Sequence, residues 1–414
     1  MGFVYPKNAA QQQAALGSTV DPGNPYRYEQ ILVKDINARG GIAGRKLLPV
    51  YHGSDAASTE TAEQRGQAAC SAFTEDDRVF AALPFSHNVY ARGTLECLRK
   101  AGAVAGLASN VSEATNSDYN AFPENFDVSA TSMDRMCANL IPTLVRGGYF
   151  SKWDTVQGKP GAMPVKVGIL APDLRPYRDS IKNICLPALA RAGFAVDPRD
   201  VYFFYFSNTA SDNGRILTDI QSAGLKFKSD GVTHVIPVEQ NGMAFFGQNA
   251  ENQKYYPRYG VNSHSGTQVY NGIFLTGKQL NGAVGLGYLP SIDLPEQLNP
   301  DNGPYSSDAR RQCVKLMKDN GQTFGSTSAQ ANALALCDVV YTLKRIIEQI
   351  PAGSPINAST YAATLATLGD VPSANVPAAF LGQGHLDAIT LGWQWQYFAD
   401  CQCMHYNGNA FKLS

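Results

Sequence analysis

Two successive series of short apolar strands, with helices between the strands, constrain the fold of this chain more than any other feature. In the first 125 residues, strands are predicted at 46–51, 79–83 and 103–107, and Gly2 to Tyr5 is predicted to be the end of a further strand. Strands that are apolar throughout and separated by helices are typical of parallel sheets buried on both faces. The first series therefore predicts a parallel sheet covered by helices.

The same alternation begins again after a polar connection at 121–128. Strands are predicted at 165–170, 201–206, 232–238 and 258–261, with helices at 131–145, 177–192, 214–223 and 243–249. Three more helices are predicted at 306–320, 328–349 and 360–368, followed by a strand with Trp393, Trp395 and Tyr397 on one packed face. The whole pattern predicts an α/β protein with two doubly wound parallel-sheet lobes.

Glycines and small polar residues set the expected boundaries of these elements. Gly40-Gly41 is expected to end the first helix, because glycine adopts the left-handed conformation found at helix C-termini. Ser54 or Asp55 is expected to cap the next helix, which runs to about residue 73. Gly282, Gly285 and Gly287 are interpreted as part of a flexible connection.

The charge balance excludes some partners. The 414 residues carry 34 basic and 35 acidic side chains, a formal net charge of -1, with no long run of either sign. We therefore expect neither nucleic acid nor an anionic membrane surface as a partner. No apolar stretch approaches the roughly 18 residues needed to span a bilayer. The chain opens on Gly2 to Tyr5 without a signal peptide, so we expect that an export or lipoprotein signal has been removed.

Eight cysteines indicate the compartment. They form no CxxC motif, and no pairs of cysteine or histidine have zinc-finger spacing. An even number spread along the chain favours disulfides in an oxidising compartment, and eight buried free thiols in a cytosolic protein are the alternative. Cys401 and Cys403 with His405 could bind a metal, but a disulfide is favoured there. We predict no metal site.

One segment resembles a known family. Residues 35–47 read DINARGGIAGRKL. This is similar to the DINAxGGIxGxxL stretch of type I periplasmic binding proteins, which include the substrate-binding proteins of branched-chain amino acid ABC transporters and the receptor family ligand-binding regions. The resemblance extends more loosely over nearly the whole chain. The segment is also a tight helix-to-strand turn in its own right, and it gives no information about the ligand.

The resemblance implies a periplasmic-binding-protein-like I fold, in which three chain crossings near 122–128, 285–290 and 381–389 join the lobes. Lobe 1 would contain 1–125 and 290–385, and lobe 2 would contain 126–289 and 386–414. The protein would be exported, to the periplasm or the cell exterior, with or without a lipid anchor. It would deliver a small solute to the permease and ATPase of an ABC importer, with no cofactor. A sensor or receptor of the same fold is the alternative.

The ligand is expected in the cleft between the lobes, because ligands of open α/β sheets bind beyond the carboxyl ends of the strands. Ser86 and the pair Ser109-Asn110 match the family positions that hold the carboxylate of the solute. The full set of candidates is Tyr5, Ser86, His87, Ser109 and Asn110 from lobe 1, and Arg175, Tyr177, Glu239, Asn241, Asn262, Ser263 and His264 from lobe 2.

The sequence departs from the family at one of these positions. Amino-acid binders place a carboxylate just after the strand that ends here at Gly260, where it pairs with the ammonium group of the solute. This chain has Val261-Asn262-Ser263-His264 instead. Glu239, at the end of the previous strand, could take the place of this carboxylate, although its side chain would approach the ammonium group from another direction. This departure argues against an α-amino acid as the solute. The solute is expected to be an amino acid-like molecule, an organic acid or a short peptide, because Arg175 and His87 near the cleft suit an organic acid, a short peptide or another polar solute equally well.

The lobe assignment also predicts the disulfides. Pairing cysteines on successive or neighbouring helices of one lobe gives Cys70–Cys97, Cys137–Cys185 and Cys313–Cys337, which leaves Cys401–Cys403. No bridge then crosses the cleft, as a hinge motion requires.

Signatures of enzymes are weak in this sequence. Residues 272–278 read GxxxxGK, but Gln279 follows where a phosphate-binding loop needs a hydroxyl. GxSxG and HExxH motifs are absent from the sequence. His234, inside an apolar strand, is expected to be a core residue. A hydrolase that uses His264 and the serines beside it is the alternative to a binding protein without catalysis.

Overall fold

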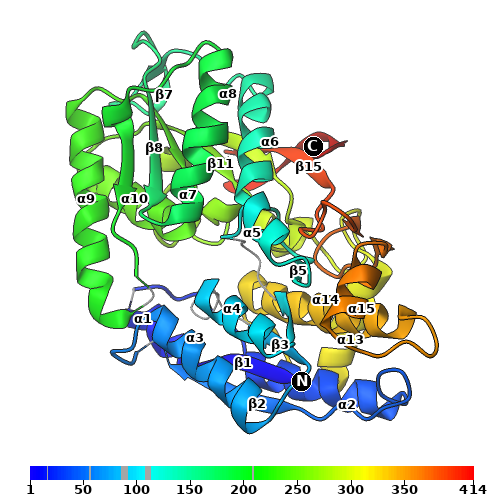
Figure 1. The fold of residues 1–414 in the computed structure, drawn as a ribbon. Coiled ribbons are helices and arrows are strands. Elements are labelled where there is room, and N and C mark those ends of the chain that lie inside the picture. Colours follow the sequence, from blue (N-terminus) through cyan, green and yellow to red (C-terminus); the bar gives the residue numbers. More distant parts are fainter. Residues whose placement is uncertain (16, 56, 85–91, 108–112, 208) are drawn as a thin grey trace.

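The computed structural model describes residues 1–15, 17–55, 57–84, 92–107, 113–207 and 209–414. These residues form two lobes, and Figure 1 shows one above the other. Lobe 1, with the N-terminal strand, is the half built on a five-stranded sheet. Lobe 2 is the half built on a seven-stranded sheet. The predicted α/β architecture with two parallel-sheet lobes is confirmed.

The lobe 1 sheet is parallel, with the strand order β2-β1-β3-β4-β5. Its strands are β1 (Gly2–Lys7), β2 (Val50–Asp55), β3 (Ala81–Pro84), β4 (Val104–Leu107) and β5 (Phe126–Asp127). The helices of this part of the chain are α1 (Ala9–Ala15), α2 (Pro25–Ala38), α3 (Ala62–Ser71), α4 (Arg92–Lys100) and α5 (Asn116–Ala121). A π-helical turn, Ala72–Asp76, continues α3.

Helices cover both faces of this sheet. Phe3 packs into one hydrophobic cluster and Val4 into another, because successive strand side chains point to opposite faces. Helices α3 and α4 pack together on the side of Val4, and α2 packs with α14 on the other. The later elements are α12 (Pro290–Asp293), α13 (Asp308–Asp319), α14 (Thr327–Gln349), α15 (Ala358–Leu365), β13 (Gly369–Val371) and β14 (Ala379–Leu381).

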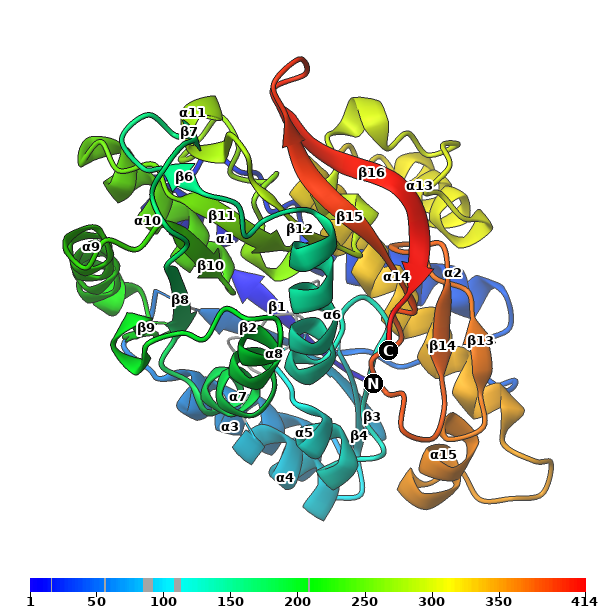
Figure 2. The same cartoon turned by 90° about the horizontal axis from the view of Figure 1, so that it is seen from above.

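The lobe 2 sheet has the order β16-β15-β12-β11-β10-β8-β9. Five strands are parallel, namely β8 (Val167–Pro172), β9 (Val201–Phe204), β10 (His234–Pro237), β11 (Arg258–Asn262) and β12 (Val284–Gly287). Figure 2 shows the long antiparallel hairpin of β15 (Leu391–Phe398) and β16 (Cys403–Lys412), which pairs with β12. Two short strands, β6 (Trp153–Asp154) and β7 (Lys159–Pro160), pair separately.

The helices of lobe 2 are α6 (Met133–Arg146), α7 (Arg175–Ser180), α8 (Leu186–Arg191), α9 (Asn213–Ser229), α10 (Gln240–Asn252) and α11 (Gly277–Leu280). A π-helical segment, Ile181–Cys185, joins α7 to α8, so the helix predicted at 177–192 is continuous. Among the described residues, no helix is long and apolar enough to cross a membrane.

Several predicted core features are confirmed. Trp393 and Trp395 are buried on one face of β15, and the indole of Trp395 donates to the carbonyl of Asp293 over 2.9 Å. His234 is buried, with one ring nitrogen 2.8 Å from the hydroxyl of Thr233 and the other 3.0 Å from the carbonyl of Tyr149. Trp393, Trp395 and His234 are therefore structural residues of the core.

Other boundaries in lobe 1 were predicted wrongly. The strand predicted at 46–51 is β2, Val50–Asp55, because the Asn37 side chain holds the backbone of Leu47 outside the sheet through two hydrogen bonds of 2.7 and 2.9 Å. The next helix is capped by Thr61, not by Ser54 or Asp55, since Ser54 and Asp55 belong to β2.

The flexible connection predicted from Gly285 and Gly287 is also wrong, because both lie within the paired strand β12. Gly285 is required by a close approach of two strands. A Cβ atom added there would lie 1.7 Å from the carbonyl oxygen of Val261 in β11.

The structure contains four disulfides. They join Cys70 to Cys97, Cys137 to Cys185, Cys313 to Cys337 and Cys401 to Cys403, which are the predicted pairs. The first joins α3 to α4, and the second joins α6 to the π-helical segment beside α7. Each bridge therefore ties elements of one lobe together, and none of the four joins one lobe to the other.

Candidate functional site: the cleft between the lobes

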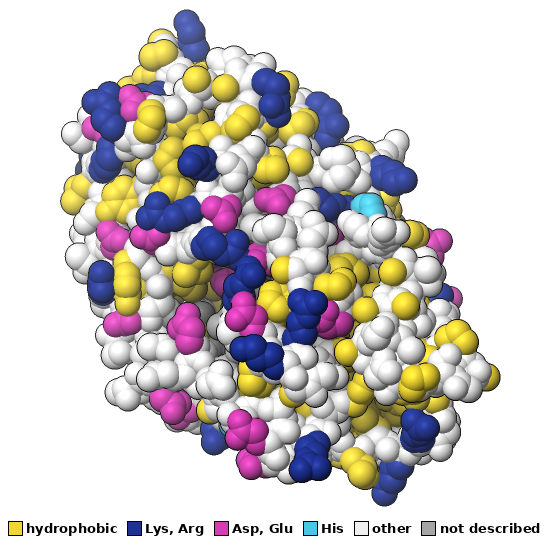
Figure 3. All heavy atoms as spheres, in the orientation of Figure 1, with side chains coloured by type: hydrophobic (Ala, Val, Ile, Leu, Met, Phe, Trp, Pro, Cys, Tyr) yellow, Lys and Arg dark blue, Asp and Glu magenta, His cyan; other side chains and the backbone are white. Residues whose placement is uncertain are grey.

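A cavity of about 480 Å³ lies where the two lobes face each other. Figure 3 shows basic and acidic side chains gathered around the middle of the molecule. Lobe 1 lines the cavity with residues of α3, α4, α5 and their flanks, and lobe 2 lines it with the segments that follow β8 and β9. The lining residues are Thr61–Glu63, Arg92, Leu95, Glu113, Asp118, Phe122, Leu174–Pro176, Tyr205–Ser207, Thr209 and Asp212.

The lobe 2 side of the cavity lies beyond the carboxyl ends of two neighbouring parallel strands. Leu174–Pro176 follows β8, and Tyr205–Ser207 follows β9. Glu113 on the lobe 1 side follows β4. This is the edge at which open α/β sheets bind ligands.

An ion pair joins the lobes across the cleft. One guanidinium nitrogen of Arg175, in lobe 2, lies 2.5 Å from a carboxylate oxygen of Asp118, in lobe 1. Arg92 approaches the same oxygen to 3.6 Å. The other Asp118 oxygen accepts hydrogen bonds from the backbone and hydroxyl of Thr115, of 2.9 and 2.7 Å, which fix the carboxylate at the start of α5. A second contact, from the hydroxyl of Thr209 to the carbonyl of Glu60 over 3.4 Å, also joins the lobes.

Glu113, which lines the cavity, is coupled electrostatically to two buried side chains of lobe 2, Tyr177 and Glu239. Tyr177, in the first turns of α7, is fully buried, and its hydroxyl has no hydrogen-bond partner. Glu239 is buried and caps α10 through a 3.1 Å bond from the backbone of Gly242. Burial, followed by the charge of Glu239, raises the pKa of Glu113 to about 8. Burial raises the pKa of Tyr177 as well, and the charges of Glu113 and Glu239 raise it further.

The segment Asn262–His264 is buried beside this region. The hydroxyl of Ser263 donates to Asp293 over 2.8 Å, and that of Ser265 donates to the carbonyl of Asn262 over 2.6 Å. Neither serine proton is therefore directed at the imidazole of His264, as a hydrolase would need. The amide nitrogen of Asn262 donates to the carbonyl of Pro237 over 3.2 Å, while its side-chain oxygen has no partner.

The remaining sequence-predicted residues are placed differently. The ring of Tyr5 packs at a tilt of 33° against that of Tyr26, with centroids 4.5 Å apart, and does not line the cavity. Asn241 lies in the first turn of α10. Ser86, His87, Ser109 and Asn110 lie outside the residues that the structure describes. The structure thus brings Arg175, Tyr177 and Glu239 toward the cleft.

Sequence reasoning missed several lining residues. Glu113 lies further into the segment after the fourth strand than the two positions chosen there. Asp118 belongs to α5, a six-residue helix that was not predicted. Tyr205 and Phe206 were assigned to a strand, but β9 ends at Phe204. Tyr205 and Phe206 directly follow the end of β9, and this signal could have found them, whereas Glu113 and Asp118 lie further from the end of β4 at Leu107.

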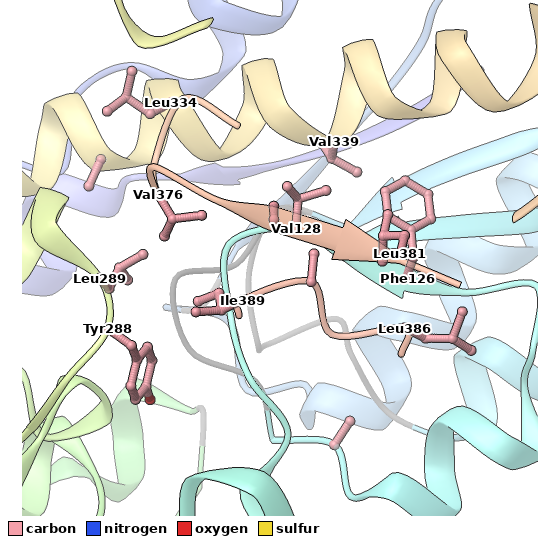
Figure 4. Packing of buried hydrophobic residues seen from close by; sticks show 14 of the residues in the cluster. Phe126, Val128, Tyr288, Leu289, Leu334, Val339, Val376, Leu381, Leu386 and Ile389 are labelled. Atoms are coloured by element: carbon pink, nitrogen blue, oxygen red, sulfur yellow. The ribbon is translucent and has the colours of Figure 1, made fainter. Parts of the chain in front are cut away.

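The floor of the cleft is the hinge, where the chain passes between the lobes three times within the described residues: after β5, after β12 and before β15. The backbone of Asp127, in the first crossing, exchanges two 2.8 Å hydrogen bonds with Leu386 and Ala388, in the third. Tyr288 and Leu289 form the second crossing, and both are fully buried. Figure 4 shows the apolar side chains of all three crossings packed beside α14.

Arg135, on α6, holds the third crossing. Its guanidinium donates to the carbonyls of Asp387 and Ile389 over 2.8 and 2.9 Å, and it lies 3.0 Å from the carboxylate of Asp387. The hinge is thus built from paired backbone and a buried ion pair. The described residues contain no group of three or more His, Cys, Asp or Glu side chains that could hold a metal ion.

No protein-family model matches the chain, and no curated protein sequence matches it significantly. Solved structures do resemble it. One is a possible leucine/isoleucine/valine-binding protein from Rhodopirellula baltica, with 15% identity and a TM-score of 0.63, covering 99% of this chain and 96% of that chain. A second is an ABC transporter substrate-binding protein from Desulfitobacterium hafniense in complex with Leu, with 15% identity and a TM-score of 0.60, covering 98% and 99%.

A third is an ABC transporter solute-binding protein from R. palustris in complex with 4-hydroxybenzoate, with 12% identity and a TM-score of 0.67, covering 99% of this chain and 96% of that chain. At these identities the likeness concerns the fold. The chain has the type I periplasmic-binding fold that its sequence predicts, over nearly its whole length.

Proposed function

We propose that this protein is the extracytoplasmic solute-binding protein of an ABC importer, which closes around a small polar organic solute and does not transform it. The observation that carries the proposal is the cavity of about 480 Å³ lined by side chains from both lobes. Such a cavity fits a small molecule, and a ligand that contacts both lobes stabilises the closed form over the open one.

The same proposal divides the chain into lobe 1, residues 1–125 and 290–385, and lobe 2, residues 126–289 and 386–414. Sheet membership supports this division, because β1 to β5 form the five-stranded sheet of lobe 1, whereas β15 and β16 extend the sheet of lobe 2 beyond β12. Three crossings that pack side by side allow a rotation of one lobe against the other with small changes in backbone angles.

The proposed location is the periplasm or the cell exterior, and four disulfides support an oxidising compartment. The proposed partners are a membrane permease and its ATPase, as the solved structures of ABC transporter proteins with this fold suggest. Anchoring by a lipid stays a prediction.

A thermal-shift screen tests whether the protein binds a solute. Amino acids, organic acids, short peptides and aromatic acids are added one at a time, because a solute at about 100 times its Kd should stabilise the protein by about 2.7 kcal/mol. Small-angle scattering with a stabilising solute should then show a smaller radius of gyration. A screen without any stabilising solute, or a verified solute without compaction, would contradict the proposal.

Arg175→Ala tests the closure itself, because it removes the ion pair with Asp118 across the cleft. Such a partly exposed pair is worth about 0.5–1 kcal/mol, so the ratio of closed to open molecules in the ligand-free protein should fall by about two- to fivefold. Arg199→Ala is the matched control, since Arg199 pairs with Asp197 within lobe 2 and is exposed. Equal radii of gyration for the two variants would show that the pair does not hold the lobes together.

A further inference from the structure

A second cavity, of about 700 Å³, lies within lobe 1. It is lined by the segment that follows α12, by the end of α13 and by the start of α14. It shares no lining residue with the cavity between the lobes. Its volume falls in the range of about 300–1,000 Å³ that is typical of small-molecule sites. The solute-binding function proposed above assigns no role to this second cavity.

The lining of the second cavity is polar and mostly uncharged. Ten of its thirteen lining residues have polar or charged side chains, and seven of these ten carry an amide or a hydroxyl group. Amides and hydroxyls can both donate and accept hydrogen bonds. A lining of this kind suits a ligand that also carries many donors and acceptors.

The charge of Asp301, in the lining, is compensated within the protein. One of its carboxylate oxygens lies 3.2 Å from a guanidinium nitrogen of the buried Arg310 and 3.1 Å from the amide nitrogen of Gln330. The other oxygen lies 3.5 Å from the ammonium group of Lys318. A bound ion would compete with these charges, whereas a neutral ligand with hydroxyl groups would leave the pairs intact.

Asn299 is an independent observation in the same lining. The residue is 4% exposed, and its amide nitrogen donates to the carbonyl of Pro290 over 2.7 Å, which fixes the side chain. Its side-chain oxygen is buried and has no hydrogen-bond partner. Leaving a buried acceptor unpaired costs free energy, which a donor on a ligand would recover. The wall of the cavity therefore offers a fixed acceptor to a ligand hydroxyl.

Phe324 adds an apolar surface to this polar lining. Its side chain is half-buried and packs edge-on against the ring of Tyr28, with centroids 6.1 Å apart. Aromatic side chains contribute a large apolar contact area in one fixed orientation. A sugar ring has hydroxyl groups around its edge and an apolar face of C–H groups, so it matches an aromatic ring among amides and hydroxyls.

We propose that the second cavity binds a neutral mono- or disaccharide. Hydroxyl groups of the saccharide pair with Asn299, Asp301 and Lys318, and the C–H face of one ring packs against Phe324. The site is separate from the cleft, so the inference does not depend on the function proposed above. A free sugar and a sugar unit of a cell-surface glycan present the same hydroxyl groups, and the test separates these two sources.

The test measures binding to the full chain by saturation-transfer NMR, followed by titration for the Kd. The probes are maltose, cellobiose and N,N′-diacetylchitobiose, with tartrate and spermidine as an anion and a cation that also carry several polar groups. Sedimentation with insoluble amylose, cellulose and chitin provides the glycan arm. The variants are Lys318→Ala, whose side chain is 59% exposed, and Phe324→Leu. Lys315→Ala is the matched control, because Lys315 lies on the same helix and pairs with Asp319 outside the cavity.

We expect at least one disaccharide to bind wild type and Lys315→Ala with the same Kd. Lys318→Ala should weaken that binding about tenfold, because it removes a charged hydrogen-bond donor. Phe324→Leu should weaken it at least about threefold. Since Phe324 also packs against Tyr28, its melting temperature is compared with that of wild type, and Lys318→Ala decides the outcome if Phe324→Leu is unfolded. Sedimentation with a polysaccharide that Lys318→Ala loses would identify a glycan as the source, and binding of the disaccharide alone would identify a free sugar.

Three results would overturn the inference. The first is the absence of binding by every saccharide and polysaccharide, which would mean that the cavity holds water only. The second is a saccharide that binds Lys318→Ala as tightly as wild type, because that saccharide would occupy another site, the cleft included. The third is tighter binding of tartrate or spermidine than of any saccharide, lost in Lys318→Ala or Phe324→Leu, because the cavity would then select ions.

Discussion

Asp293 is a buried carboxylate whose ionisation should make the stability of the folded protein depend on pH. One carboxylate oxygen accepts three hydrogen bonds, from the hydroxyl of Ser263 (2.8 Å), the backbone of Leu289 (2.9 Å) and the hydroxyl of Tyr406 (2.7 Å). Its other oxygen has no partner and is buried. Complete burial raises the pKa of Asp293 from 3.8 to about 7 despite these three bonds, which lower it.

The sign of the pH dependence follows from this shift. The unfolded chain loses the Asp293 proton near pH 3.8, whereas the folded protein keeps it up to about pH 7. Asp293 therefore contributes most to stability below pH 3.8, and this contribution is lost as the pH rises to about 7. About two pH units separate pH 5 from the folded pKa, and each unit is worth about 1.4 kcal/mol, so the loss between about pH 5 and pH 8 is about 2.7 kcal/mol.

Asp293→Asn removes this titration while its side-chain oxygen can still accept the same donors. We expect the free energy of unfolding of the variant, relative to wild type, to rise by about 2–3 kcal/mol between about pH 5 and pH 8. Urea denaturation at both pH values measures the two differences. Differences that agree within about 0.5 kcal/mol would mean that Asp293 is ionised in the folded protein, and the reasoning would be refuted.

Three further predictions concern stability. Gly285→Ala should cost at least about 3 kcal/mol of unfolding free energy in urea melts, whereas Gly93→Ala, in α4 with no atom within 4 Å of the added Cβ, should gain about 0.5–1 kcal/mol. Removing the disulfide Cys137–Cys185, which has a sequence separation of 48, should lower the free energy of unfolding by about 4 kcal/mol. Removing Cys401–Cys403, which has a separation of 2, should lower it by about 2.5 kcal/mol less. Calorimetric melting compares the two variants, and equal losses would contradict the loop-entropy reasoning. Burial raises the pKa of Glu29, whose two oxygens have no hydrogen-bond partner, so Glu29→Gln should reduce the loss of stability that occurs as the pH rises above the ordinary pKa of a glutamate, and parallel pH profiles would refute this.

The order of strands and helices could be predicted from the sequence because buried parallel strands are apolar along their whole length. Val104–Leu107 and Val167–Pro172 were found for this reason, since every residue in each is buried. β2 was misplaced because its buried and half-buried positions include His52, Gly53 and Ser54, which lack the apolar character of a central strand. β12 was missed because its close contact with β11 requires glycine at position 285, where a β-branched residue would have indicated a strand in the sequence.

The candidate site could be predicted only in part, because its residues are brought together by the closure of two lobes. Tyr177 and Glu239 lie within a few residues of the ends of β8 and β10, two strands of the lobe 2 sheet, and this local signal nominated them. The pairing of Arg175 with Asp118 depends on how α5 faces α7 across the cleft, and the sequence spacing of these residues carries no information about that distance. The same holds for Glu113, whose pKa is raised first by burial and then by the charge of Glu239 in the other lobe.

The position of β15 and β16 also has a consequence for how a chain emerging from an export channel or a ribosome would fold. These two strands follow all the helices from α12 to α15 in chain order, yet they complete the sheet of lobe 2 beside β12. Until they arrive, one side of β12 is an unpaired strand edge, which is prone to pair with other chains. Lobe 2 therefore cannot complete its sheet while it emerges, and a nascent chain that stalls before residue 391 should be an early target for holding chaperones.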